Sequence, residues 1–122
     1  MPEPGTIAWV DLTVGNADEL RGFYTAVVGW ECEELRVGDY SDYVMRPPGG
    51  GEAVAGICHA KGVNEGLPPQ WLVYLTVADL DASLARCLEL GGKVRAEPFP
   101  MGGFGRMAVI EDPSGAVAAL LQ

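Results

Sequence analysis

The sequence repeats itself once, at an offset of 63 residues. Val10 falls on Val73, residues 12–14 fall on 75–77, and residues 53–55 fall on 116–118. Ten of 59 ungapped pairs are identical, where composition alone supplies only a few. A chance alignment of two similar strands is disfavoured, because helix caps and turn residues align as well. An internal repeat of this length determines the whole architecture, so we expect two copies of one structural unit.

The first copy begins with a strand and a helix. Residues 7–14 alternate between apolar and mixed positions, which is typical of a half-buried strand. Asn16, with Glu19 three residues later, has the pattern of a helix start, and Gly29 that of a helix end. The apolar residues expected to face the core share helical spacing: Leu20, Phe23, Tyr24 and Val27.

The second copy follows the same order. Asp79 takes the place of Asn16 and caps a helix that Gly91 and Gly92 end. Three further strands follow each helix: residues 30–37, 42–46 and 52–59 in the first copy, and 93–98, 105–111 and 116–122 in the second. We therefore predict an α+β fold of two βαβββ modules in a single domain, 1–122. Module one is 5–60, the linker is 61–69 and module two is 70–122.

Charge and cysteine usage restrict the partners and the compartment. The net charge is -9 and the pI about 4.4, so the basic surface that nucleic acids and anionic membranes require is missing. No apolar run approaches a membrane span, and the start lacks the pattern of a secretion signal. Cys32, Cys58 and Cys87 are an odd number at unrelated spacings. We expect free thiols and a cytoplasmic protein.

One side of the first strand of each module has the composition of a binding surface. It carries Trp9, Asp11 and Thr13 in the first module, and Leu72, Tyr74 and Thr76 in the second. If the two sheets close towards each other, these faces line a cleft with aromatic and apolar walls and few polar groups, as small-molecule pockets do. The expected ligand-binding residues are Trp9, Asp11, Tyr43, Leu72, Tyr74, Phe104 and Arg106.

Several motifs together resemble the vicinal oxygen chelate superfamily, the group of glyoxalases, bleomycin-resistance proteins and extradiol dioxygenases. They are WVDLTV, FY and GW within residues 9–30, AVAGI at 53–57, YLTVADLDASLARCLELGG at 74–92, and GR with EDPSGAVAAL at 105–120. The resemblance covers nearly the whole chain. It implies paired βαβββ modules, a U-shaped cleft and a homodimer.

The resemblance also implies four metal-ligand positions. They correspond here to Trp9 and Leu72 near the start of each module's first strand, and to Gly56 and Ala119 in the last strands. None of these side chains can donate an electron pair to a divalent metal. We therefore expect neither a metal nor another cofactor.

Three further features have alternative interpretations. Asp11 is either a general base with a pKa raised by apolar neighbours or a structural carboxylate paired with Arg46 or Arg106. Residues 99–107, with Phe104 at their centre, form a lid over the ligand or an ordinary loop or dimer contact. His59 is expected at the surface or against the linker, because no cysteine lies at a zinc-site spacing from it.

These inferences favour a metal-independent protein that binds or sequesters a small apolar or aromatic molecule. The alternative is a glyoxalase-like lyase, isomerase or dioxygenase, either metal-free with Asp11 as base or with metal donors placed elsewhere. A third interpretation is a structural or regulatory protein whose cavity is filled by Trp9 and its neighbours. The fold alone does not separate them.

Overall fold

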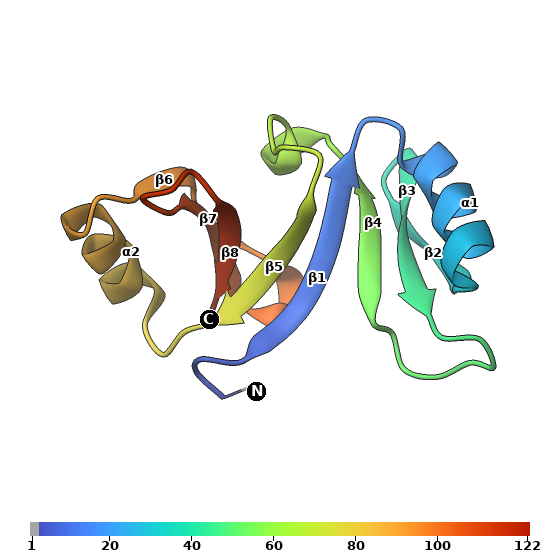
Figure 1. Cartoon of the computed structure of the whole chain (residues 1–122), viewed down its shortest axis with the longest axis horizontal. Helices are drawn as coiled ribbons and strands as arrows, with labels where there is room; N and C mark the ends of the chain where they lie inside the picture. Colours follow the sequence, from blue (N-terminus) through green and yellow to red (C-terminus); the bar gives the residue numbers. More distant parts are fainter. Residues whose placement is uncertain (1–2) are drawn as a thin grey trace. The chain divides into compact units, whose positions relative to one another are not determined.

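The computed structural model describes residues 3–122 (Figure 1). Its contacts divide the chain into two compact units, Val10–Trp71 and Leu72–Gln122, and the segment that ends at Trp9 groups with the second. We call them the N-terminal and the C-terminal unit. The predicted limit of module one at residue 5 differs from this division, because Gly5 donates a hydrogen bond to the Thr76 carbonyl (2.7 Å) and Thr76 donates one to the Thr6 carbonyl (2.9 Å).

The N-terminal unit contains one helix and four strands, apart from the first residues of β1. They are β1 (Ile7–Val14), α1 (Ala17–Val28), β2 (Glu31–Val37), β3 (Tyr40–Arg46) and β4 (Ala55–His59). The strand order is β2-β3-β4-β1, with β1 and β4 parallel and the other pairs antiparallel. A short 3-10 helix, η1 (Gly62–Asn64), lies within the predicted linker.

The C-terminal unit repeats this arrangement. Its elements are β5 (Trp71–Thr76), α2 (Leu80–Glu89), β6 (Lys93–Pro100), η2 (Gly102–Phe104), β7 (Arg106–Glu111) and β8 (Val117–Leu121). The order is β5-β8-β7-β6, with β5 and β8 parallel. The described part of the chain thus holds two helices and eight strands in mixed pairing, which confirms the α+β fold of two βαβββ modules.

Each unit packs its helix against one face of its own strands. In the N-terminal unit Ala17 of α1 packs on the buried strand side chains Leu12, Val14, Tyr43, Met45 and Ile57. In the C-terminal unit Leu80 and Leu84 of α2 pack on Ala108 and Leu120. Burial of these apolar side chains is the main term that stabilises each module. No helix of residues 3–122 is long and apolar enough to cross a membrane.

The predicted core face of α1 is wrong for two of its four residues. Phe23 and Val27 are exposed, whereas Leu20 and Tyr24 pack against the core. The reason is that α1 approaches the strands through Ala17, which is completely buried. The side of the helix that meets the sheet is therefore centred on Ala17, Leu20 and Tyr24, and it is narrower than the apolar stripe in the sequence.

The two helix starts differ in their capping. The Ala82 N–H donates a hydrogen bond to the Asp79 carboxylate at 3.1 Å, as predicted for α2. Asn16 makes no such bond at α1, and its side-chain amide instead donates to Glu19 at 3.4 Å. Gly29 ends α1 in the left-handed region, with φ of 87°, as the sequence predicts.

We expect Asp79→Ala to lower the free energy of unfolding by about 1 kcal/mol, because the substitution removes an N-cap hydrogen bond. Asn16→Ala is the matched control in the other module and should cost clearly less. Urea unfolding of both variants measures the difference. Equal losses would show that the cap of α2 does not depend on the Asp79 side chain.

Candidate functional site

Each unit has one sheet face that its helix covers and one that it leaves uncovered, which we call the helix-free face. Strand register assigns residues to these faces, because neighbours in a row point to the same side. Leu12 pairs with Ile57, and Ile57 pairs with Tyr43, all in the core under α1. Asp11 and its partner Gly56 therefore lie on the helix-free face.

The helix-free face of the N-terminal unit brings Asp11 close to a thiol. Asp11 is buried, with 7% of its surface exposed, and the neighbouring row pairs Thr13 with Cys58. Burial is the largest cause that raises the pKa of the Cys58 thiol, and the charges of Asp11 and Asp42 raise it further. This face therefore combines two carboxylates with a protonated thiol.

The helix-free face of the C-terminal unit is mainly apolar. Tyr74 pairs with Ala119, and Leu72 and Thr76 point to the same side of β5. All three β5 side chains are buried, Tyr74 with 4% of its surface exposed. Among the described residues, the Thr76 hydroxyl is a buried side-chain oxygen without a hydrogen-bond partner. A ligand group that bonded this hydroxyl would relieve the cost of leaving it unsatisfied.

Three of the other predicted ligand residues, Tyr43, Arg106 and Phe104, lie away from these faces. Tyr43 lies in the core under α1. Arg106 points towards α2, where it forms an ion pair with Asp81 at 3.3 Å. Phe104 lies in η2 with 74% of its surface exposed, and Trp9 is half-buried at the end of the segment that belongs to the C-terminal unit. Leu72 and Tyr74 lie two residues apart on the helix-free face of the C-terminal unit, and Asp11 lies on that of the N-terminal unit.

The arginines considered as partners of Asp11 have other carboxylates within reach. Arg46 donates to Glu33 through two of its nitrogen atoms, at 3.0 and 2.9 Å. Arg106 pairs with Asp81, as described above. Each arginine thus makes at least one charge-assisted contact with a carboxylate of its own unit.

The residues at the four implied metal positions do not fit a metal ion. Register places Gly56 and Ala119 on the helix-free faces, opposite Asp11 and Tyr74. Glycine, alanine, leucine and tryptophan side chains offer no oxygen, imidazole or thiolate ligand. Within residues 3–122 no three His, Cys, Asp or Glu side chains group in a way that could hold a metal ion.

Sequence reasoning missed a polar network around His59, which was expected at the surface. The ring is buried, with 8% of the residue exposed. Its Nδ1 lies 3.4 Å from the Asp42 carboxylate, and its Nε2 lies 3.5 Å from that of Asp18. The His59 backbone N–H also donates to Asp42 at 2.8 Å. The network ties the start of α1 to β3 and β4.

Tyr43 joins the network through its hydroxyl, which donates to the Asp18 carboxylate. This hydrogen bond is the main cause that raises the pKa of Tyr43 from 10.0 to about 12. Arg21 lies over the ring, with its guanidinium carbon 4.8 Å from the ring centre. Three elements supply these residues, so no local sequence pattern contains them. Only the polar residues within or at the end of a strand, Asp42 in β3 and His59 in β4, hint at the network.

We expect Asp18→Asn to lower the pKa of Tyr43 from about 12 towards its ordinary value, because an amide no longer favours the neutral phenol. In the native protein the bond stabilises the fold below the ordinary tyrosine pKa of about 10, and the contribution is lost as the pH rises through the folded value. An alkaline titration followed by tyrosinate absorbance measures the pKa of Tyr43. Glu19→Gln is the control, and an unchanged Asp18→Asn profile would disprove the assignment.

The paired βαβββ modules define a class of α+β proteins with a duplicated scaffold. The model of the Glyoxalase/Bleomycin resistance protein/Dioxygenase superfamily matches residues 6–120, and the chain belongs to this superfamily. This confirms the resemblance seen in the sequence.

Two curated relatives illustrate the range of the family. CFP32 of Mycobacterium tuberculosis, named as a candidate glyoxylase, is 38% identical over 97% of this chain and 46% of its own length. The anthracycline biosynthesis protein DnrV of Streptomyces peucetius is 35% identical over 93% of this chain and 40% of its own length. The chain thus spans about half the length of these relatives.

Solved structures show the same fold at low identity. Methylmalonyl-CoA epimerase from Mycobacterium tuberculosis matches with a TM-score of 0.57 and 19% identity, over 99% of this chain and 91% of the other. A superfamily member from Vibrio splendidus matches with a TM-score of 0.60 and 13% identity, over 96% of this chain and 99% of the other. At this identity the likeness describes the scaffold and not the reaction.

Proposed function

We propose that this chain binds a small, partly apolar or aromatic molecule without a metal ion. The ligand lies on the helix-free face of the C-terminal unit, against Leu72 and Tyr74, and Trp9 contributes from the segment that belongs to this unit. The observation that carries the proposal is the residue set at the four implied metal positions. Enzymes of this family hold a metal at these four positions. In this chain the same positions offer no metal ligand and present mainly apolar surface: Trp9, Gly56, Leu72 and Ala119.

Two further observations support a flat ligand. Tyr74 offers an aromatic ring, and the Thr76 hydroxyl on the same strand face is available for one hydrogen bond. A mainly apolar wall with a few polar groups is the usual composition of a small-molecule site. Relatives of this chain are named for anthracycline biosynthesis, which makes an anthracycline a suitable first probe.

An enzyme is the second candidate, and Asp11 is the observation that favours it. A buried carboxylate near Cys58, on the helix-free face of the sheet, is a reasonable proton acceptor. In this alternative the protein is a glyoxalase-like lyase, isomerase or dioxygenase that uses Asp11 as base in place of a metal. Asp11→Asn should then lower turnover at least about a hundredfold while ligand binding stays; equal turnover would remove Asp11 from the mechanism.

The binding proposal predicts that a flat aromatic probe stabilises the folded protein. At a concentration one hundred times its Kd, an anthracycline should add about 2.7 kcal/mol to the free energy of unfolding. Tyr74→Leu should abolish the added stability, whereas Tyr40→Leu, a change in the other unit, should not. Differential scanning fluorimetry measures each variant with and without probe.

Two results would contradict this proposal. A stoichiometric iron, nickel, zinc or manganese ion that survives dialysis of the purified protein would overturn metal independence. A broad set of flat compounds that leaves the melting temperature unchanged would favour the third interpretation, in which the side chains themselves fill the cavity.

We also propose a cytoplasmic homodimer. The three cysteines are free, which suits a reducing compartment. The exposed side of α1 presents Phe23, Val27 and Val28 to solvent, and a contiguous apolar patch of this kind is typical of an interaction surface.

Light scattering tests the homodimer. The native chain should have twice the monomer mass, and Val27→Lys should return it to the monomer mass because the cation places a charge in an apolar interface. Thr25→Lys, a change at a polar α1 position, is the control. A native monomer at micromolar concentration would disprove the dimer.

A further inference from the structure

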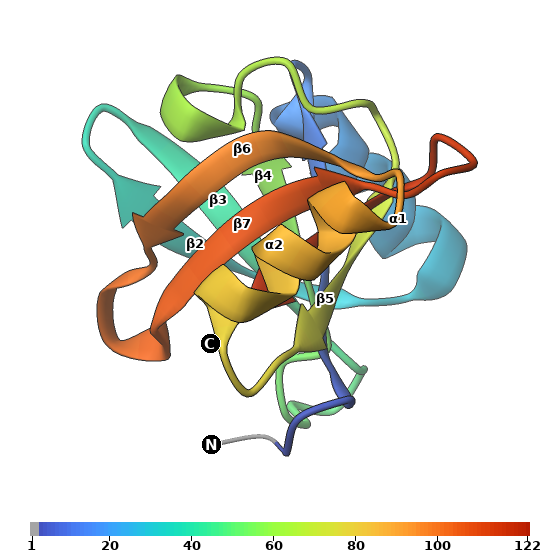
Figure 2. The ribbon, with the colours of Figure 1, turned by 90° about the vertical axis from the view of Figure 1, so that its left-hand side faces the viewer.

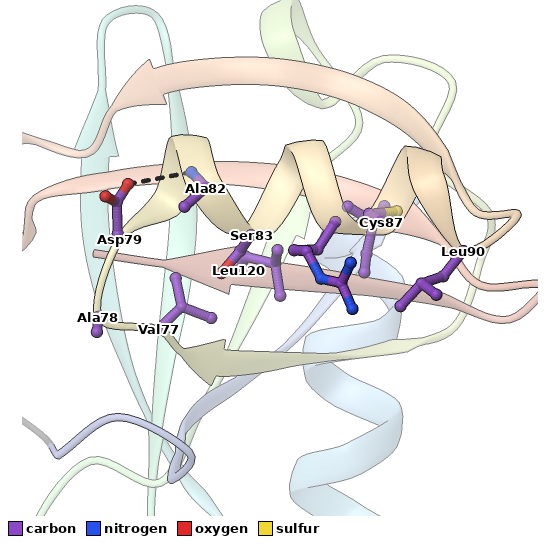
Figure 3. A pocket seen from close by; sticks show the side chains of 10 residues that line it. Val77, Ala78, Asp79, Ala82, Ser83, Cys87, Leu90 and Leu120 are labelled. Carbon is purple, nitrogen blue, oxygen red and sulfur yellow. Dashed lines mark hydrogen bonds between the residues drawn. The ribbon is translucent and has the colours of Figure 1, made fainter.

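A groove runs along α2 in the C-terminal unit, on the opposite side of the sheet from Tyr74. The groove is shallow and open to solvent, and its volume is about 490 Å³. Figure 3 shows Leu120 on its strand side, Val77 just after β5, Ser83 and Cys87 on α2, and Leu90 just after the helix. Ile110 of β7 also lines the groove. The surface of the groove is predominantly apolar.

The groove exists because α2 carries small side chains where α1 carries large ones. Ser83 and Cys87 stand 63 residues after Leu20 and Tyr24. In the N-terminal unit Leu20 and Tyr24 pack against the core and fill the space between helix and strands. A hydroxymethyl and a thiol leave the equivalent space in the C-terminal unit open.

The position of α2 widens this space. The helix makes its main contacts with β6 and β7, over which it lies in Figure 2. The other helix, α1, makes its main contacts with β4 and β2. Since β8 corresponds to β4, the last strand of the C-terminal unit is less covered by its helix than its counterpart is.

The polar groups of the groove favour an anion at one place. Arg86 is the single Lys or Arg among the lining residues. Its partner is Glu89 at 2.6 Å, but both side chains are largely exposed, Arg86 at 67%, so the ion pair is weak and exchangeable. The Asp79 carboxylate, which also lines the groove and accepts from the Ala82 N–H, is the cap at the start of α2 and stands about two helix turns from Arg86, so the anion is favoured only at the Arg86 end.

We propose that this groove is a second ligand site, which binds a small aromatic carboxylate. The ring takes the space that the Tyr24 and Leu20 side chains fill in the other module, between Ser83, Cys87 and Leu120. The carboxylate pairs with the Arg86 guanidinium, for which it competes with Glu89. This site lies on the helix side of the sheet and is independent of the function proposed above.

A titration with 2-naphthoate, followed by two-dimensional NMR, tests the location and the charge. Amide signals of Ser83, Cys87 and Leu120 should move, and those of Leu72 and Tyr74 should not. Arg86→Gln should weaken naphthoate binding about tenfold and leave binding of neutral 2-naphthol unchanged. Arg95→Gln, which removes a cation elsewhere in the same unit, is the control. Naphthoate shifts at Leu72 and Tyr74 alone, or equal losses in both arginine variants, would overturn the proposal.

The double variant Ser83→Leu with Cys87→Tyr gives the groove the residues of module one. It should eliminate naphthoate binding and keep the native pattern of the remaining amide signals. If the new tyrosine does not fit beside Gly92, the single variant Ser83→Leu replaces the double variant. It should weaken naphthoate binding at least about tenfold, because the leucine side chain takes up part of the groove volume. Unchanged binding in a folded filled variant overturns the site. Amide signals of the groove residues that shift when the protein is diluted without naphthoate would also overturn the site, because a second copy of the chain would then cover the groove.

Discussion

The parallel pairing of the first and last strand in each module is the constraint on which the structure depends. Parallel neighbours require a crossover connection, and in both modules a helix begins that crossover and remains on one side of the sheet. The registers agree across the repeat: Asp11 pairs with Gly56, and Tyr74, 63 residues later, pairs with Ala119. Every module therefore has one face that its helix covers and one helix-free face. This division decides on which face each candidate site residue lies.

The fold was largely predictable because the signals that define it are local and occur twice. Alternation in residues 7–14, Asp79 as a cap and Gly29 as a helix end each act within a few residues. The register of the hairpins was harder to predict from the sequence. Ile57 faces Tyr43, whereas Leu120 faces Ala108 and not Arg106, the residue 63 positions after Tyr43. The turn is shorter in the second module, and turn length sets the register of a hairpin.

The candidate site was only partly predictable, for a different reason. Period-two alternation placed Asp11, Leu72 and Tyr74 on the helix-free faces. Tyr43 and Arg106 point to the helix sides because the register pairs Tyr43 with Ile57 and puts Arg106 two residues before Ala108. The His59 network joins a helix start, a strand interior and a strand end. Such contacts depend on tertiary packing, and the periodicity of a single sequence carries no signal of them.

The environment of Cys58 affects how readily the thiols of this protein are oxidised. Alkylating agents and peroxides attack the thiolate form of cysteine, and burial together with the Asp11 and Asp42 charges keeps this thiol protonated. The sulfur thus reacts slowly, and among the three cysteines Cys58 should be the last to be oxidised.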